Sequence, residues 1–176
     1  MTIKKLSLRL IDFCDAKFIL DLRSDYELNK FLQKFNASLD NQVEWIKNYK
    51  YKEEKNKEFY FIIEEDSSKK IGTIRSHDID YKKSEFELGS FIVDKNRSSY
   101  RNAAPYALSL FFDFHFNKLG LEACHFYCKN INEKAKNFYL RYGVNLVKQD
   151  SDNVHFNYKK EKFNNAKDNF LSMKLI

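Results

Sequence analysis

The sequence predicts a single α+β domain over residues 1–176, in which a mixed β-sheet of about seven strands is flanked by helices on both faces. The length of 176 residues suits one domain, and a hydrophobic share of 43% is enough for a folded core. The predicted elements follow the order strand, helices, three meandering strands, helix, strand, helix and hairpin. Strands joined by a crossover helix are parallel and meandering strands are antiparallel, so this order implies a mixed sheet.

The N-terminal third carries one strand followed by helices. Apolar and polar residues alternate at its start, which is the period of a half-buried strand. Carboxylate or hydroxyl side chains then precede apolar residues at helical spacing, and such side chains cap helix N-termini. The predicted elements are a strand at Lys5–Ile11, a helix capped by Asp15, a helical stretch at Asp25–Phe35, a short helix capped by Ser38 or Asp40, and a polar loop at Lys50–Glu58.

The rest of the chain changes from a meander to strand–helix units. Apolar runs separated by polar turns predict three antiparallel strands, at Phe59–Glu64, Lys70–Arg75 and Phe86–Val93. A helix with Pro105 in its first turn is predicted at Ala103–Lys118. The remaining predicted elements are a strand at Ala123–Cys128, a helix from Asn132 or Glu133 to Tyr142 that Gly143 stops, a hairpin at Leu146–Gln149 and Val154–Tyr158, and a polar C-terminal extension at residues 159–176.

Composition and charge argue against several classes of function. The formal net charge is +6, but Lys and Glu alternate, as in Lys50–Lys57, instead of forming the basic cluster of a nucleic-acid binder. No stretch is apolar enough to span a membrane, and the N-terminus lacks the apolar region of a signal peptide. Cys124 and Cys128 share a strand face from which His125 points away, so no metal site is expected. We therefore expect a cytoplasmic protein that binds neither nucleic acid nor membranes.

Residues 86–104 combine a strand, a polar loop and the start of a helix. A helix start presents unpaired N–H groups and a partial positive charge, which together bind phosphate. Small residues such as Ser99 let a ligand approach the backbone, and Asn102 tolerates a positive φ. Arg97 and Arg101 add positive charge for a phosphate. The alternative is an ordinary polar loop that Asn102 caps.

Two motifs are similar to those of a known family. The first is Glu87-Leu-Gly-Ser-Phe-Ile-Val-Asp followed by Ser99-Tyr-Arg-Asn-Ala-Ala. Ser99, Asn102 and Ala104 occupy the defined positions of a coenzyme loop Gln/Arg-x-x-Gly-x-Gly/Ala, with Ser and Asn replacing the first two residue types. The second motif, Asn132-Glu-Lys-Ala-Lys-Asn-Phe-Tyr-Leu-Arg-Tyr-Gly, fits Asn-x-x-Ala-x-x-Phe-Tyr-x-x-x-Gly at every defined position. Through these motifs the chain resembles the GNAT superfamily of acetyl-CoA-dependent N-acetyltransferases.

The resemblance implies an enzyme that uses acetyl-CoA as a co-substrate and needs no metal. The coenzyme's pyrophosphate is expected at the start of the helix that follows the loop, and its thioester beside the preceding strand. The residues that the resemblance assigns to the coenzyme are Phe91, Ile92, Val93, Ser99, Tyr100, Arg101, Asn102, Ala103, Ala104, Asn132 and Phe138.

Direct acetyl transfer needs a base for the amine, a donor for the oxyanion and a proton for the leaving thiolate. Tyr139 lies about two helical turns after Asn132 and is the expected proton donor. The alternative is that Tyr139 merely packs beside Phe138. Glu87 is the expected base, because it lies beside the coenzyme strand and Gly89 leaves space next to it. Its rivals for this role are Glu85, His77 and Asp78.

The acceptor is the least determined part of this interpretation. The upstream segments Asp21-Leu-Arg-Ser-Asp and Glu44-Trp-Ile resemble the subgroup of ribosomal-protein N-terminal and nucleotide-sugar amine acetyltransferases. This resemblance implies a small-molecule amine acceptor, with the amino group of a nucleotide-linked sugar for surface glycans as the first choice. The alternatives are a protein N-terminal amine and an acyl-CoA-binding module without turnover, and a homodimer is left open. The residues that could stack a base or pair with phosphate are Arg23, Tyr26, Phe31, Phe35 and Trp45, of which Phe31 and Trp45 are expected in the core.

Overall fold

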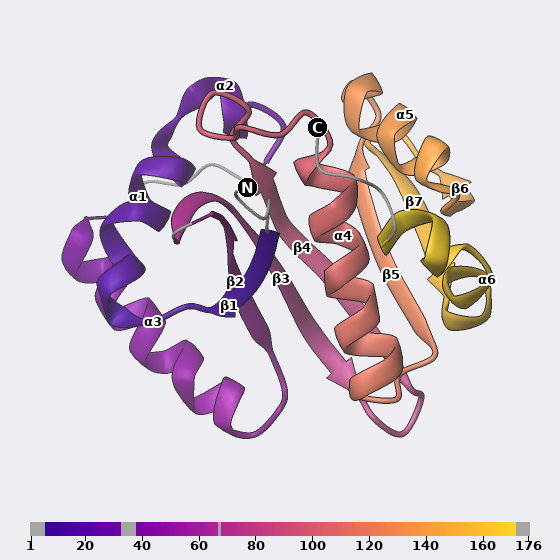
Figure 1. The fold of residues 1–176 in the computed structure, drawn as a ribbon, viewed down its shortest axis with the longest axis horizontal. Helices are drawn as coiled ribbons and strands as arrows, with labels where there is room; N and C mark the ends of the chain where they lie inside the picture. Colours follow the sequence, from indigo (N-terminus) through magenta and orange to yellow (C-terminus); the bar gives the residue numbers. More distant parts are fainter. Residues whose placement is uncertain (1–5, 33–37, 67, 172–176) are drawn as a thin grey trace.

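A seven-stranded mixed sheet forms the centre of the molecule (Figure 1). The structure is a computed structural model that describes residues 6–32, 38–66 and 68–171. Within these residues the strand order is β1-β2-β3-β4-β5-β7-β6, and β4–β5 is the one parallel pair, which confirms the predicted mixed sheet. The strands are β1 (Leu6–Leu10), β2 (Phe59–Glu65), β3 (Lys69–Asp80), β4 (Glu85–Val93), β5 (Ala123–Lys129), β6 (Asn145–Gln149) and β7 (Asn153–Lys159).

Helices cover both faces of the sheet in two groups, as predicted (Figure 1). From β2, Tyr60 and Ile62 point into one apolar cluster with Ile19 and Ile46, which belong to the N-terminal helices. Phe61 alternates to the other face and joins the larger cluster around the C-terminal helices. The helices are α1 (Ala16–Ser24), α2 (Tyr26–Asn29) and α3 (Leu39–Glu54) on the first face, and α4 (Ala103–Asp113), α5 (Glu133–Tyr142) and α6 (Lys160–Leu171) on the second, with a 3-10 turn η1 (Phe13–Asp15) and a π-helical turn η2 (Phe114–Lys118).

The C-terminal extension is part of the fold. Residues 160–171 form α6, although the sequence pattern predicts a polar tail there. The side chain of Phe163 is fully buried, with its ring 6.1 Å from that of Phe112 and 5.7 Å from that of Phe116. One buried aromatic among polar residues gives little periodic signal, so the expectation of a tail was wrong.

Three other predicted boundaries differ from the structure. The predicted loop at Lys50–Glu58 begins with the last turn of α3, which a Lys50–Glu53 ion pair of 2.8 Å supports. Strand β3 continues to Asp80 instead of ending at Arg75, because its polar residues pair with β4. The helical stretch predicted to reach Phe35 is short, since α2 ends at Asn29 and residues 33–37 lie outside the described part.

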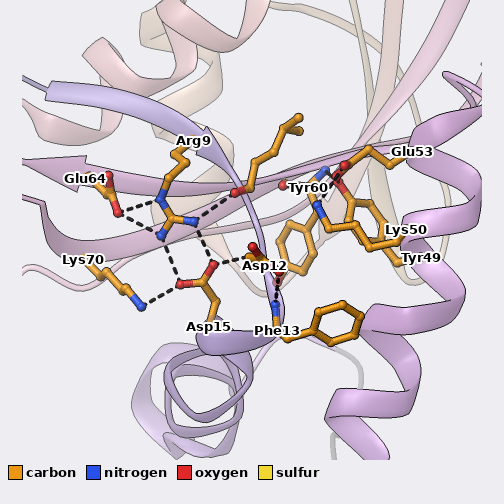
Figure 2. Close-up of polar contacts among 11 residues, drawn as sticks. Arg9, Asp12, Phe13, Asp15, Tyr49, Lys50, Glu53, Tyr60, Glu64 and Lys70 are labelled. Carbon is orange, nitrogen blue, oxygen red and sulfur yellow. Dashed lines mark hydrogen bonds and ion pairs between the residues drawn. The ribbon is translucent and has the colours of Figure 1, made fainter.

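A buried ionic network attaches α1 to the sheet (Figure 2). The fully buried Asp15 carboxylate accepts hydrogen bonds from Arg9 at 2.9 and 3.0 Å and pairs with Lys70 at 2.6 Å. Arg9 also donates to Glu64 of β2. Burial opposes the ionisation of Asp15, but the bonds from Arg9 and Lys70 outweigh it and lower its pKa to about 2. Asp15 is therefore an anchor and not the predicted side-chain cap of α1, while Asp12 caps the preceding turn.

Candidate active site

Strands β4 and β5 separate halfway along their length. They pair over Glu85–Glu87 and Ala123–His125, and among the described residues no pairing joins them beyond this point. We call the unpaired part, Leu88–Val93 of β4 opposite residues 126–129 of β5, the strand opening. The starts of α4 and α5 lie at this end of the sheet (Figure 1). Main-chain groups on the β5-facing edge of β4 are thus left for a ligand.

A β-bulge distorts β4 within the strand opening. The register between β3 and β4 slips between Thr73 and Arg75, and Ser90 has a positive φ of 47°. The Thr73 hydroxyl donates to the Ser90 carbonyl at 3.1 Å. A Cβ on Gly72 would lie 2.1 Å from the Ile92 carbonyl oxygen, so only glycine allows this approach of the two strands.

The predicted coenzyme residues of β4 follow this bulge. Ile92 is buried, whereas Phe91 and Val93 are half-buried. The ring of Phe91 lies 6.1 Å from that of Phe138 on α5, so residues from the two predicted motifs meet here. Because β3 takes one edge of this segment, alternate N–H groups on its other edge face the strand opening. These are the main-chain donors expected for an oxyanion.

The loop before α4 is held by two carboxylates. The Ser99 N–H donates to Glu65 at 2.7 Å, and Lys69 donates to the Ser99 hydroxyl at 3.1 Å. The Tyr100 hydroxyl donates to Asp66, and this bond raises the pKa of Tyr100 to about 12. Two residues assigned to the coenzyme, Ser99 and Tyr100, therefore already have partners within the chain.

The start of α4 keeps donors available. Among the described residues, no acceptor in the chain takes the N–H of Arg101 or of Ala104, whereas the buried Ala103 donates to the Tyr100 carbonyl at 3.4 Å. The expectation of a positive φ at Asn102 was wrong, because its φ is −103°. Its side chain makes no helix-capping bond either, so the alternative of an Asn102-capped loop is not what the structure shows.

Helix α5 is fixed at both ends by its motif residues. The Asn132 side chain accepts the Ala135 N–H at 3.1 Å and so caps the helix start. Gly143 ends the helix with a φ of 92°, and its N–H donates to the Leu140 carbonyl. Since its oxygen is used by the cap, Asn132 has its amide N–H₂ group left to offer a ligand.

Tyr139 lies on α5 with its ring against β5. The ring is 4.6 Å from that of Phe126 and 5.5 Å from that of Phe156. Burial raises the pKa of Tyr139 well above its usual value, so the phenol keeps its proton at neutral pH. Within the described part of the chain, no group hydrogen bonds to its hydroxyl. The Tyr139 ring also packs beside Phe138, as the alternative of a packing role expects. The hydroxyl nevertheless keeps a proton that it can donate.

The side chain of Glu87, on β4, lies on the opposite face of the sheet from Tyr139. Its strand neighbours across the sheet are His77 on β3 and His125 on β5. The space expected beside it at Gly89 is filled, because a Cβ there would lie 2.9 Å from His77 Nε2. Glu87 and His125 also help to line a pocket of about 190 Å³ on this face.

The rival bases have distinct surroundings. Glu85 faces His125 at 3.2 Å, and His77 Nδ1 lies 2.7 Å from Asp78. Sequence reasoning predicts no metal, yet ligand atoms of His77, Asp78 and Glu87 lie within 4.8 Å of one another. In the described residues this is the one such group, and the sequence hides it because its members come from two strands.

The aromatic and basic residues that the sequence offers for binding a nucleotide do not gather at one place. Arg23 lies 3.4 Å from the Ser90 hydroxyl at the bulge, so one cation does reach the strand opening. Trp45 was expected in the core but is 36% exposed, with Arg75 stacked 5.1 Å from its ring. Tyr26 is 76% exposed, and Phe35 lies outside the described residues.

Comparison with known proteins decides the family. The model of the acetyltransferase (GNAT) domain matches residues 5–145. The chain belongs to the GNAT acetyltransferase family. This GNAT protein is similar to a solved structure described as apo FdhC, a nucleotide-linked sugar GNAT, with 32% identity over 94% of this chain and 92% of that one and a TM-score of 0.85.

Another similar structure is the spermidine N-acetyltransferase from Vibrio cholerae in complex with CoA and spermine. It is 20% identical over 90% of this GNAT chain and 97% of that chain, with a TM-score of 0.78, which shows a shared fold. No significant match was found among curated proteins. The GNAT protein is thus an acetyl-CoA-dependent N-acetyltransferase with the expected α+β fold. None of its described helices is both long and apolar enough to cross a bilayer.

Proposed function

We propose that this acetyltransferase moves the acetyl group of acetyl-CoA to the amino group of a nucleotide-linked amino sugar. The similarity to a nucleotide-linked sugar GNAT carries this proposal, because it reaches 32% identity over 94% of the chain. The position of Arg23 supports it, since a guanidinium beside the strand opening suits an acceptor that carries phosphate. The spermidine enzymes share the fold at 20% identity, which favours no acceptor.

The coenzyme would be held by main-chain donors. Its pyrophosphate would take the N–H groups of Arg101 and Ala104 at the start of α4, where the helix dipole favours an anion. Its thioester arm would lie in the strand opening, between the backbone of Phe91–Val93 and Phe138. Glu65 and Asp66 would stay with Ser99 and Tyr100, which keeps two carboxylates out of contact with the pyrophosphate.

The chemistry would need one proton donor, for the thiolate, and acceptors for the two protons that the ammonium group loses. Tyr139 would protonate the departing thiolate, because its phenol carries a proton at neutral pH and none of the described residues takes its hydroxyl as a partner. Glu87 lies on the other face of the sheet, where its carboxylate would attract the acceptor's ammonium group and accept one of these protons. The main-chain N–H groups of the strand opening would stabilise the oxyanion.

An acceptor panel tests this function. The purified chain is mixed with acetyl-CoA and a nucleotide-linked amino sugar, spermidine or a peptide with a free N-terminus, and thiol release is followed. We expect kcat/KM for the amino sugar to exceed the other values at least a hundredfold. A higher value for spermidine or the peptide would replace the acceptor, and acetyl-CoA binding without thiol release from any acceptor would identify a binding module.

A further inference from the structure

His77 lies on β3 where the sheet begins to open. It is directly opposite Glu87 on β4, and its neighbour Arg75 is opposite Gly89. The Nε2 and Cδ2 atoms of its ring lie 2.9 and 3.1 Å from the position that a Cβ on Gly89 would occupy. The imidazole therefore lies against the backbone of β4, next to the bulge at Ser90, and a Cβ at position 89 would displace the ring from this position.

Asp78 holds the imidazole in one tautomer. The Nδ1 atom of His77 lies 2.7 Å from an Asp78 carboxylate oxygen, so it carries the proton of that hydrogen bond. In the neutral ring Nε2 then keeps its lone pair, and this is the atom beside the strand opening. The His77 side chain is 26% exposed and that of Asp78 is 77% exposed, so the ring is shielded while the carboxylate reaches water.

His77 and Tyr139 lie on opposite faces of the sheet. Residues directly opposite in an antiparallel pair share a face, and Tyr60, opposite Arg75, points toward α1 and α3. His77 is two residues from Arg75 and shares that face. Tyr139 packs in the other cluster, under α4 and α5. A thioester in the strand opening would thus have a proton donor on one side and a lone pair on the other.

We propose that His77, oriented by Asp78, is the general base that takes the proton from the acceptor's ammonium group; this inference rests on the proposed function. The first proton passes from nitrogen to Nε2 of His77, and the freed lone pair forms the C–N bond at the thioester carbon. The C–S bond then breaks, sulfur keeps the electron pair and takes a proton from Tyr139. Glu87 accepts the second proton of nitrogen as the amide forms. Tyr139 regains a proton from water, and His77 and Glu87 release theirs, so one proton leaves in all.

The same residues could be read as metal ligands, since His77, Asp78 and Glu87 lie together. The bond between Nδ1 and Asp78 fits either role, because a histidine that binds a metal through Nε2 also donates its other ring N–H to a carboxylate, and the chelator arm of the test separates the two. The pH response of His77 depends on the charged groups around it on this face. These groups are Arg23 of α1, Arg75 and Asp78 of β3, Glu85 and Glu87 of β4, and His125 of β5.

The test compares His77→Gln with a control variant, Lys162→Gln. Lys162 is an exposed residue of α6, on the second face of the sheet, and donates to Asn145 at 2.7 Å. We expect His77→Gln to lower kcat/KM at least a hundredfold, with acetyl-CoA affinity by calorimetry within twofold of wild type. In His77→Gln, the decrease of kcat/KM that the wild type shows at acid pH should be absent. In His77→Ala, imidazole added to the buffer should restore part of the activity. Lys162→Gln should keep the wild-type rate.

Three outcomes would overturn the inference. Activity of His77→Gln within threefold of wild type, with the acid fall retained, would remove His77 from the mechanism while leaving the acetyltransferase function in place. Loss of wild-type activity on adding a chelator, with recovery on adding Zn²⁺, would make the group a metal site. A wild-type chain that binds acetyl-CoA but acetylates no amine would refute the proposed function, and this inference with it.

Discussion

At the scale of single residues, the strand opening brings together groups whose protonation suits acyl transfer. The Tyr139 phenol is buried among aromatic rings and keeps its proton. His77 and Glu87 stand on the other side of the sheet, partly exposed to water. A phenol that carries a proton suits the leaving thiolate, and acceptors in contact with solvent suit the protons that the amine loses.

Removing the Tyr139 hydroxyl tests its role directly. We expect Tyr139→Phe to lower kcat at least tenfold, about 1.4 kcal/mol of barrier, with little change in acetyl-CoA affinity. Tyr142→Phe is the matched control, because that hydroxyl is on the same helix but bonds to Ser109 at 2.8 Å. Steady-state kinetics measure both, and equal kcat values for the two variants would assign Tyr139 to packing alone.

Charge at the start of α4 tests the coenzyme site. We expect Asn102→Asp to weaken acetyl-CoA binding about tenfold, because a carboxylate at the helix start repels a phosphate. Asn48→Asp makes the same charge change on exposed α3 and should leave the affinity unaltered. Calorimetric titration compares them, and an unchanged affinity in Asn102→Asp would place the phosphates elsewhere.

At the scale of elements, one carboxylate and one C-terminal helix supply contacts that lie outside the two motifs. Glu65, at the end of β2, orders the loop before α4 through the Ser99 N–H. Helix α6 covers α4 through Phe163. Both contacts join segments that are distant in sequence, so the scaffold of the coenzyme loop depends on parts of the chain outside the two motifs.

The contribution of α6 can be measured by truncating its buried side chain. We expect Phe163→Ala to lower the free energy of unfolding by about 3–5 kcal/mol, because it removes a fully buried ring. Lys162→Ala, on the exposed side of the same helix, should change it by less than about 1 kcal/mol. Urea denaturation gives both values, and a loss below 1 kcal/mol for Phe163→Ala would mean that α6 is not part of the cooperative fold.

Local pattern predicted the fold better than it predicted the site. The sheet, the strand–helix units and the end of α5 at Gly143 follow from hydrophobic period and glycine, which act over a few residues. The partner of Ser99, the ring of His77 over Gly89 and the network of Asp15 depend on strand pairing between distant segments. No spacing in the sequence could reveal these contacts.

At the scale of the whole molecule, acid should weaken the fold in two stages. Burial of the ring lowers the pKa of His115 from 6.5 to about 3, and the opposing effect of the hydrogen bond to the Phe111 carbonyl is smaller. Its contribution to stability is full above pH 6.5 and is lost as pH falls toward 3. The ionised Asp15 network adds a second loss, from pH 3.8 down through about 2.

The first stage predicts a measurable slope. The free energy of unfolding should fall by roughly 1.4 kcal/mol per pH unit between pH 6 and 4 on account of His115. In His115→Gln, which costs stability at neutral pH, this part of the slope should be absent. Urea titrations at several pH values provide the comparison, and parallel curves for the two proteins would show that His115 is not held neutral in the fold.

A crystal structure with coenzyme A bound would test the central claim most directly. We expect the pyrophosphate oxygens within hydrogen-bond distance of the Arg101 and Ala104 N–H groups, and the sulfur within reach of the Tyr139 hydroxyl. A coenzyme bound elsewhere, with the β4–β5 region filled by the protein's own side chains, would contradict the account.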